Sequence, residues 1–208
     1  LSGNYDDTNN LKNLDELPLK YISVNPLTAK GDEAACMICK GASTLLCTSC
    51  RTYYCTKEHL YQDDDSSHGA VCGLIEQSLL IEDMPLALKI SPQIQAKLLN
   101  YYSQVAQQCT DRARIHLIDQ NNKLAFPAAE RALHYCKKLY LNKPELINNL
   151  ILMIEISVLN DQMEPGYANL ASAQLQLINL KKSITKQIQK GLEAKIRSGF
   201  ILLSKINS

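Results

Sequence analysis

The chain has 208 residues, a formal net charge of +1, 46% hydrophobic and 21% charged residues. These values are typical of a globular protein and exclude global disorder, and the near-neutral charge gives no general reason to expect nucleic acid or membrane binding. The longest apolar runs, such as 150–154, are far shorter than the roughly 18–20 residues that a membrane span needs.

Residues 1–33 form an acidic leader with six acids and three bases. This stretch is rich in Asn and Asp with only scattered Leu, so we expect it to be mostly extended or disordered, with a helical turn at most around 11–17. Two roles remain open for it, a solvated tail and a docking arm that orders on a partner.

Residues 34–72 hold six of the eight cysteines and two of the four histidines. A C-x2-C pair places two thiolates on one tight turn, and an x3 spacing places two ligands one helical turn apart. A disulfide framework is the competing interpretation, but it gives the histidines no role. The sequence therefore predicts two four-coordinate zinc ions. Their candidate ligands are Cys36, Cys39, Cys47, Cys50, Cys55, His59, His68 and Cys72.

The expected role of these ions is structural. About forty residues cannot bury enough apolar surface to fold alone. Zinc supplies about 10–16 kcal/mol in finger peptides, which replaces the missing core. With three Cys and one His at each ion, no position stays open for the water that a catalytic zinc needs, so zinc hydrolysis is not expected.

We expect a linker at 73–90 and then a helical region at 91–208 with about five helices. Apolar residues there recur at helical spacing, and four prolines stand at expected helix starts, where the missing N–H costs nothing. From residue 73 onward the chain carries 16 bases and 11 acids. The expected helices span 92–118, with Ser91 as N-cap, and 125–140, 144–159, 165–180 and 183–205.

A faint internal repeat appears when the helical region is shifted by 41 residues. AFPAAERALHYCKKL (125–139) then falls on GYANLASAQLQLINL (166–180), and LIDQ (117–120) falls on VLND (158–161). Tandem helix-turn-helix units with small residues at close-packing points favour a TPR-like α-helical solenoid, with an irregular helical bundle as the alternative. The last helix would begin a third unit, so we expect its apolar face either to fold back or to continue into further repeats.

The metal-ligand spacing resembles a MYND-type zinc finger, here CMICKGASTLLCTSCRTYYCTKEHLYQDDDSSHGAVC. The family binds its two zinc ions in a cross-braced way. By this resemblance Cys36, Cys39, Cys55 and His59 hold one ion, and Cys47, Cys50, His68 and Cys72 hold the other. The resemblance thus implies a mostly α protein, with a small bi-zinc finger followed by the helical region.

Two features depart from the family pattern. The sixth ligand is usually Cys, and here it is His59. Many members carry a Gln and a Trp that help to form a groove for proline-containing peptides, whereas this chain has Leu60 and Asp64 in those places and no Trp. Use of that groove is therefore not expected. The acidic run 63–65 is interpreted as a solvated loop or as a contact for a basic partner.

A MYND finger with His in the sixth place, followed by TPR-like helices, is similar to axonemal MYND-domain proteins of motile cilia, which are associated with inner-arm dynein. The resemblance implies a non-catalytic adaptor of the cytoskeleton. Its expected partners are proteins, among them a TPR-type partner and dynein inner-arm subunits, and no nucleic acid or membrane is expected.

Other functional classes are less well supported by the sequence. SET-and-MYND lysine methyltransferases also join a finger to TPR-like helices, but no SET motif is present and 33 preceding residues are too few for that domain. A nuclear corepressor adaptor remains an alternative, and the ligand spacing does not match a RING ubiquitin ligase. No phosphate-binding loop or nucleophile motif appears, so an enzyme is not expected.

The remaining chemistry-bearing residues have simple interpretations. Cys109 and Cys136 are expected to be core thiols, and His116 and His134 have no nearby ligand set. Lysines on the last helix, at 182, 186 and 190, form a basic stripe. It is interpreted as a solvated face or as a surface for an acidic partner such as a microtubule.

Overall fold

The structure is a computed structural model that describes residues 20–24, 35–141, 143–181 and 183–205. The described chain is mostly helical and has one small sheet. It divides into two compact units, residues 1–61 and 62–208, which are described separately. The helical turn expected around 11–17 lies outside the described residues.

The first unit contains a three-stranded antiparallel sheet in the order β1 (Tyr21–Ser23), β2 (Leu45–Cys47) and β3 (Tyr53–Tyr54). Tyr21 of β1 and the alternate residues Leu45 and Cys47 of β2 are buried in a small core, where the rings of Tyr21 and Tyr54 meet edge to face at 6.2 Å. Part of the acidic leader is therefore an extended edge strand.

Residues 57–90 are helical for most of their length. They form α1 (Lys57–Asp63), the π-helical turn η2 (Asp64–His68), α2 (Gly69–Glu82) and the short α3 (Leu86–Lys89). The segment 73–90, expected to be a linker, therefore belongs mainly to two helices. Its apolar residues surround α2 rather than forming one stripe, which hid the helical period.

Five further helices match the expected series, with differences at three of the starts. Pro92 and Pro144 stand in the first turn of their helices, as the sequence predicts. The second helix begins earlier than expected, so Pro127 lies in its second turn and not its first. The helices are α4 (Pro92–Ile118), α5 (Asn122–Tyr140), α6 (Pro144–Leu159), α7 (Met163–Leu180) and α8 (Lys186–Ser204).

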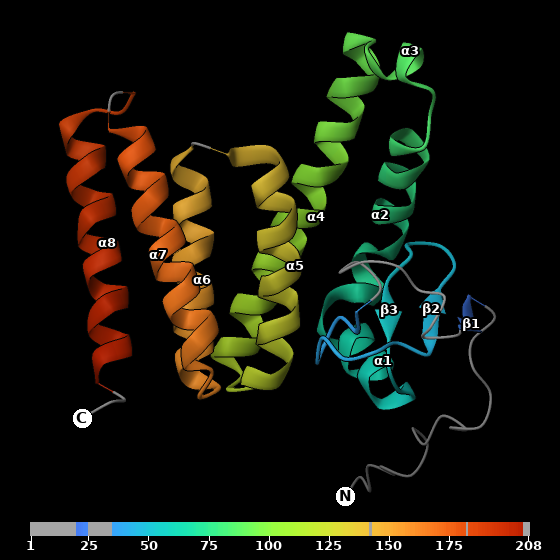
Figure 1. The fold of residues 1–208 in the computed structure, drawn as a ribbon, viewed down its shortest axis with the longest axis horizontal. Helices are drawn as coiled ribbons and strands as arrows, with labels where there is room; N and C mark the ends of the chain where they lie inside the picture. The colour runs from blue at the N-terminus through green and yellow to red at the C-terminus, as the bar shows by residue number, and fades with distance from the viewer. Residues whose placement is uncertain (1–19, 25–34, 142, 182, 206–208) are drawn as a thin grey trace, which may run out of the picture. The chain divides into compact units, whose positions relative to one another are not determined.

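Within residues 62–208, helices α2, α4, α5, α6, α7 and α8 stand in a row in chain order (Figure 1). Each helix in this series packs on the next, and α8 contacts both α6 and α7. The core lies between them, and α6 at its centre buries most of its residues. Among the described residues, no helix has the length and apolar character required to cross a membrane.

The 41-residue repeat is visible in the backbone. The turn after α4 and the turn after α6 each contain one left-handed residue, Gln120 with φ 56° and Asp161 with φ 55°. In each turn the next residue, Asn121 or Gln162, donates its N–H to the carbonyl five residues earlier at 2.8 Å. Both turns thus close the preceding helix with the same Schellman-type hydrogen bond.

Side-chain burial follows the same period. Residues of α4 that face the core are followed 41 positions later by core residues of α6, and α5 and α7 are related in the same way. Equivalent pairs, each at most 1% exposed, are Cys109 and Leu150, Ala113 and Ile154, and Ala132 and Ala173. The hairpins α4–α5 and α6–α7 are therefore equivalent in turn geometry and in buried face.

The apolar face of α8 is only partly used. Leu192, Ile196 and Leu203 are buried against α6 and α7, whereas Ile188 and Phe200 are 45% and 54% exposed. Of the two outcomes expected for this helix, folding back accounts for its buried residues.

Candidate metal centre

The two C-x2-C pairs lie in turns with the same backbone geometry. In residues 36–41 and 47–52, the residue that follows the second cysteine is left-handed, Lys40 with φ 60° and Arg51 with φ 58°. Each of them donates its N–H to the carbonyl of the first cysteine at 2.9 Å, and the N–H of that cysteine bonds back across the turn at 2.9 Å. The backbone alone therefore presents each pair of thiols on one side of a tight turn.

The first group consists of Cys36, Cys39, Cys55 and His59, whose ligand atoms lie within 4.8 Å of one another. The Cys39 and Cys55 sulfurs are 3.5 Å apart. Nδ1 of His59 is 3.0 Å from the Cys55 sulfur and 3.6 Å from that of Cys36. Helix α1 supplies the histidine one turn after Cys55, as the x3 spacing predicts.

These separations suit a metal ion and not a disulfide. A tetrahedral zinc with bonds of about 2.3 Å to sulfur and about 2.0 Å to nitrogen puts neighbouring ligand atoms about 3.5–3.8 Å apart. Two of the three distances, 3.5 and 3.6 Å, lie within that interval, and the separation of 3.0 Å between Nδ1 of His59 and the Cys55 sulfur is shorter. The Cys39–Cys55 separation far exceeds the length of about 2.05 Å of a disulfide bond, and all eight cysteines are free thiols.

The second group consists of Cys47, Cys50, His68 and Cys72, which are all buried and whose ligand atoms also lie within 4.8 Å of one another. Nδ1 of His68 is 3.0 Å from a carboxylate oxygen of Asp64. Because a metal-binding imidazole usually donates its other N–H to such a carboxylate, this contact leaves Nε2 as the ligand atom of His68. The two groups contain the same two sets of four residues that the MYND resemblance implies.

The thiols of the first group differ in acidity. Partial burial, together with the neighbouring thiols of Cys39 and Cys36, raises the pKa of Cys55 to about 12. A hydrogen bond from the backbone of Gly41 lowers the pKa of Cys39. Since a metal binds the thiolate form, loading this group must displace a proton from Cys55, and metal affinity will rise with pH.

The acidic run 63–65 is not the solvated loop that the sequence suggested. Asp63 is fully buried and forms a bidentate ion pair with Arg131 of α5, at 2.8 and 2.6 Å. Asp64 contacts His68, and only Asp65 is exposed. Sequence reasoning did not single out Arg131, because its partner lies 68 positions away and no local pattern connects them.

Three other interpretations can be compared with the structure. Leu60 is 1% exposed, so it is a core residue. Cys109 and Cys136 are at most 1% exposed, and burial raises their pKa values to about 11 and about 12, as for packed thiols. His116 bonds the carbonyl of Ser66 at 3.0 Å.

Comparison of the chain with protein-family models finds no match, and comparison with curated proteins finds none. Neither comparison assigns the chain to a family. The site is therefore characterised by its donor set, which is two groups of three sulfurs and one imidazole that could each hold a metal ion.

Proposed function

We propose that the chain is a non-catalytic adaptor that holds two zinc ions in a MYND-type finger and binds other proteins. The observation that carries this proposal is the pair of complete Cys3His groups. Soft thiolates with one imidazole favour zinc over magnesium or calcium, which prefer oxygen ligands. Four protein ligands complete a tetrahedral ion and leave no position for substrate, which supports a structural role.

Native mass spectrometry of the 208-residue chain tests the zinc assignment. We expect two zinc ions per chain, and Co²⁺ substitution should give the intense visible absorption of tetrahedral sulfur-rich sites. Cys39→Ser should reduce the count to one, whereas Cys136→Ser, at a buried thiol outside both groups, should leave it at two. A count of one or none in the unaltered chain would contradict the ligand assignment.

We interpret the helical region as a TPR-like solenoid. The support is the equivalence of the hairpins α4–α5 and α6–α7 at a period of 41 residues, with small residues such as Ala132 and Ala173 at their contacts. Stacked helical hairpins bury a continuous core and leave extended surfaces for partners.

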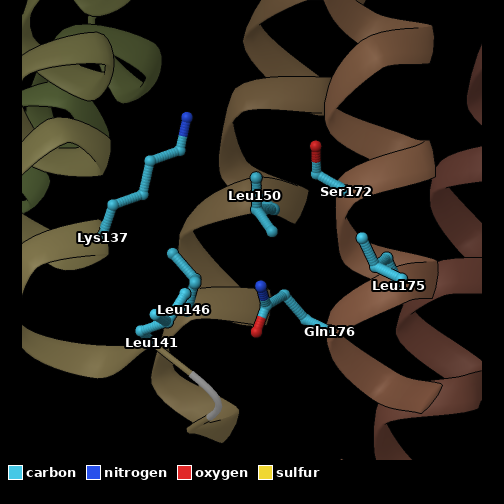
Figure 2. A pocket seen from close by; sticks show the side chains of 7 residues that line it. All are labelled: Lys137, Leu141, Leu146, Leu150, Ser172, Leu175 and Gln176. Atoms are coloured by element: carbon cyan, nitrogen blue, oxygen red, sulfur yellow. The ribbon is translucent and has the colours of Figure 1, made fainter. Parts of the chain in front are cut away.

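One such surface is a hollow between α5, α6 and α7. Figure 2 shows Lys137 on one wall and Ser172 and Gln176 on the other, with Leu146 and Leu150 between them. Its volume of about 240 Å³ is below the range of about 300–1,000 Å³ that small-molecule pockets occupy, so it fits a side chain better than a metabolite. The lining residues are Lys137, Leu141, Leu146, Leu150, Ser172, Leu175 and Gln176.

We propose that this hollow receives an acidic protein segment that carries a leucine-type side chain, and its lining supports this choice. Leu141 and Leu175 are 62% and 57% exposed at its rim. Within the described part of the chain, no carboxylate lies within ion-pair distance of Lys137. The sequence of α7 has no acid after Glu164, so a partner's carboxylate could pair with Lys137 beside an apolar floor.

Selection of peptides displayed on phage against the purified chain tests this assignment. We expect enriched peptides to combine Asp or Glu with Leu, Ile or Met. Leu175→Asp should abolish their binding and Lys137→Glu should weaken it, while Leu159→Asp, a change at an equally exposed leucine of α6, should have no effect. Peptides of another composition, or peptides insensitive to Leu175→Asp, would contradict the assignment.

For the cellular setting, we propose an inner-arm dynein assembly of the ciliary axoneme, on the MYND and TPR-like resemblance. A basic stripe on α8 offers a surface for the microtubule, because Lys186, Lys190 and Arg197 are all exposed. The tagged protein should co-purify from axonemes with a TPR-type partner and inner-arm dynein subunits. Recovery entirely outside the axonemal fraction would overturn this part of the proposal.

A further inference from the structure

The segment that carries two ligands of the second metal group is fastened to the helical region by buried polar contacts. It runs from Gln62 to Cys72 and includes the π-helical turn η2, with His68 and Cys72 one helical turn apart. Ser66, Ser67 and His68 are all fully buried, as is Asp63. Polar groups buried to this extent require partners, and α4 and α5 provide them.

Arg131 of α5 provides the strongest contacts. Its guanidinium, in a side chain that is 4% exposed, donates two hydrogen bonds to Asp63 and a third, at 2.6 Å, to the Ser67 hydroxyl. A bidentate guanidinium fixes the orientation of its partner as well as its distance. Ser67 immediately precedes His68. By holding the Ser67 side chain, Arg131 restricts the backbone that sets the direction of the His68 imidazole.

A proline near the start of α5 allows backbone carbonyls of that helix to accept hydrogen bonds from residues 62–72. Pro127 has no N–H to donate to the carbonyl of Lys123, four residues earlier. Gln62 donates its side-chain amide to that carbonyl at 3.2 Å, and the Ser66 hydroxyl donates to the neighbouring Leu124 carbonyl at 2.7 Å.

The equivalent position in the second hairpin, 41 residues after Pro127, is Ala168. The proline is thus a feature of the hairpin that receives η2 and not of the repeat. From α4, Nε2 of His116 donates to the Ser66 carbonyl at 3.0 Å, so both helices of the first hairpin hold the turn.

We propose that the α4–α5 hairpin is a scaffold for the second metal group, with Arg131 as the positioning residue for His68. The first group takes all four ligands from residues 36–59, whereas the second takes His68 from the turn that the helical hairpin holds and Cys72 from the first turn of α2. Binding of metal and ordering of the hairpin must then be reciprocally coupled at the second group. This inference rests on the metal-binding part of the proposed function and is independent of any partner.

Site-resolved zinc release from the full chain is the first test. Arg131→Met removes the three hydrogen bonds at similar length, and Arg114→Met, on the exposed face of α4, is the matched control. We expect Arg131→Met to release one of its two zinc ions to a chromophoric chelator at a concentration about 10–100-fold lower, the usual effect of losing an outer-shell partner. The other zinc should be released as in the unaltered chain.

A purely structural role for Arg131 would give a different result, with a lower thermal midpoint and unchanged release of both ions. That result would overturn the proposal. Arg131→Lys retains the charge but not the bidentate geometry, so its release should lie between those of the unaltered chain and Arg131→Met.

Hydrogen exchange in the unaltered chain is a second test, and it does not depend on whether Arg131→Met folds. Removal of metal should increase exchange in residues 122–136 of α5 at least tenfold and leave α8 unchanged. Equal exchange in α5 with and without metal would overturn the coupling. If the chain binds no zinc at all, the proposed function fails first, so the two failures are distinguishable.

Discussion

The cysteine-rich residues 35–61 and the helical residues 92–204 achieve order by different means. In the first region the buried side chains are few, and several of them are the candidate ligands themselves, such as Cys36 and Cys47 at 0% exposure. In the second, a continuous apolar core runs through five packed helices. The comparison teaches that the first region has too little apolar core to hold its fold without the proposed metal ions, whereas the second is stabilised by packing.

Metal removal should separate the two regions most clearly. With excess chelator we expect residues 35–61 to lose all slowly exchanging amides while α6 retains them, because structural zinc contributes about 10–16 kcal/mol in small fingers. Hydrogen exchange with mass spectrometry measures both regions in one sample. Persistent protection of β2 and β3 after metal removal would contradict the comparison.

A core truncation should have the converse effect. Ile154 is fully buried at the centre of α6, so Ile154→Ala should lower the free energy of unfolding of the helical unit by about 2–5 kcal/mol. Its zinc content should remain at two. Leu159→Ala, at a leucine that is 54% exposed, should change stability by less than about 0.5 kcal/mol. Urea denaturation followed by circular dichroism distinguishes these outcomes.

Glycine substitution in the two left-handed turns should raise stability by an amount that depends on the strain of the residue replaced. Gln120→Gly should stabilise the helical unit by about 0.5–1 kcal/mol, because a residue with a Cβ is strained at φ 56°. Asp161→Gly should give a smaller gain, since Asp tolerates this conformation better. Thermal unfolding provides the measurement, and destabilisation by either change would show that the turn side chains make contacts that outweigh strain.

The smallest expected effect concerns acid sensitivity within the helical unit. Burial opposes ionisation of Glu82, but hydrogen bonds from Tyr102 and Lys138 outweigh it and hold the pKa below the ordinary value of 4.5. The unfolded carboxylate therefore takes up its proton first, and the stabilisation is lost as pH falls below 4.5 through the folded pKa. Glu82→Gln should reduce this loss of stability at low pH by less than about 1 kcal/mol, because the ion pair is part-exposed.

The pKa of Glu155 is shifted in the opposite direction to that of Glu82. Glu155 is an exposed residue, but partial desolvation by its neighbours still raises the pKa of its carboxyl, so its contribution to stability declines as pH rises from 4.5 through the folded pKa. Glu155→Gln should therefore stabilise the chain at neutral pH, and a stability profile that changes equally for both substitutions would contradict these assignments. Thermal midpoints from pH 3 to 7 measure both.

The sequence predicts well what is encoded locally. Ligand spacing within 36–72 identified the eight metal-ligating candidates, and prolines at 92 and 144 marked two helix starts. It failed where the decisive partner is distant: Arg131 is 68 positions from Asp63, and nothing near either residue indicates the ion pair. Helix α2 was missed because its apolar residues face all sides, which removes the periodicity that reveals a surface helix.

The matching turns at Gln120 and Asp161 have a practical consequence for protein engineering. The turns after α4 and α6 have the same backbone geometry. The chain could therefore be cut in the first turn and rejoined in the second without changing the orientation of the helix that follows. A shortened chain in which residue 121 is followed directly by residue 163 would carry one hairpin fewer and still present α7 to α4. The turn is thus a natural splice point for changing the number of hairpins, and this particular deletion would put Ser172 in the place of Arg131.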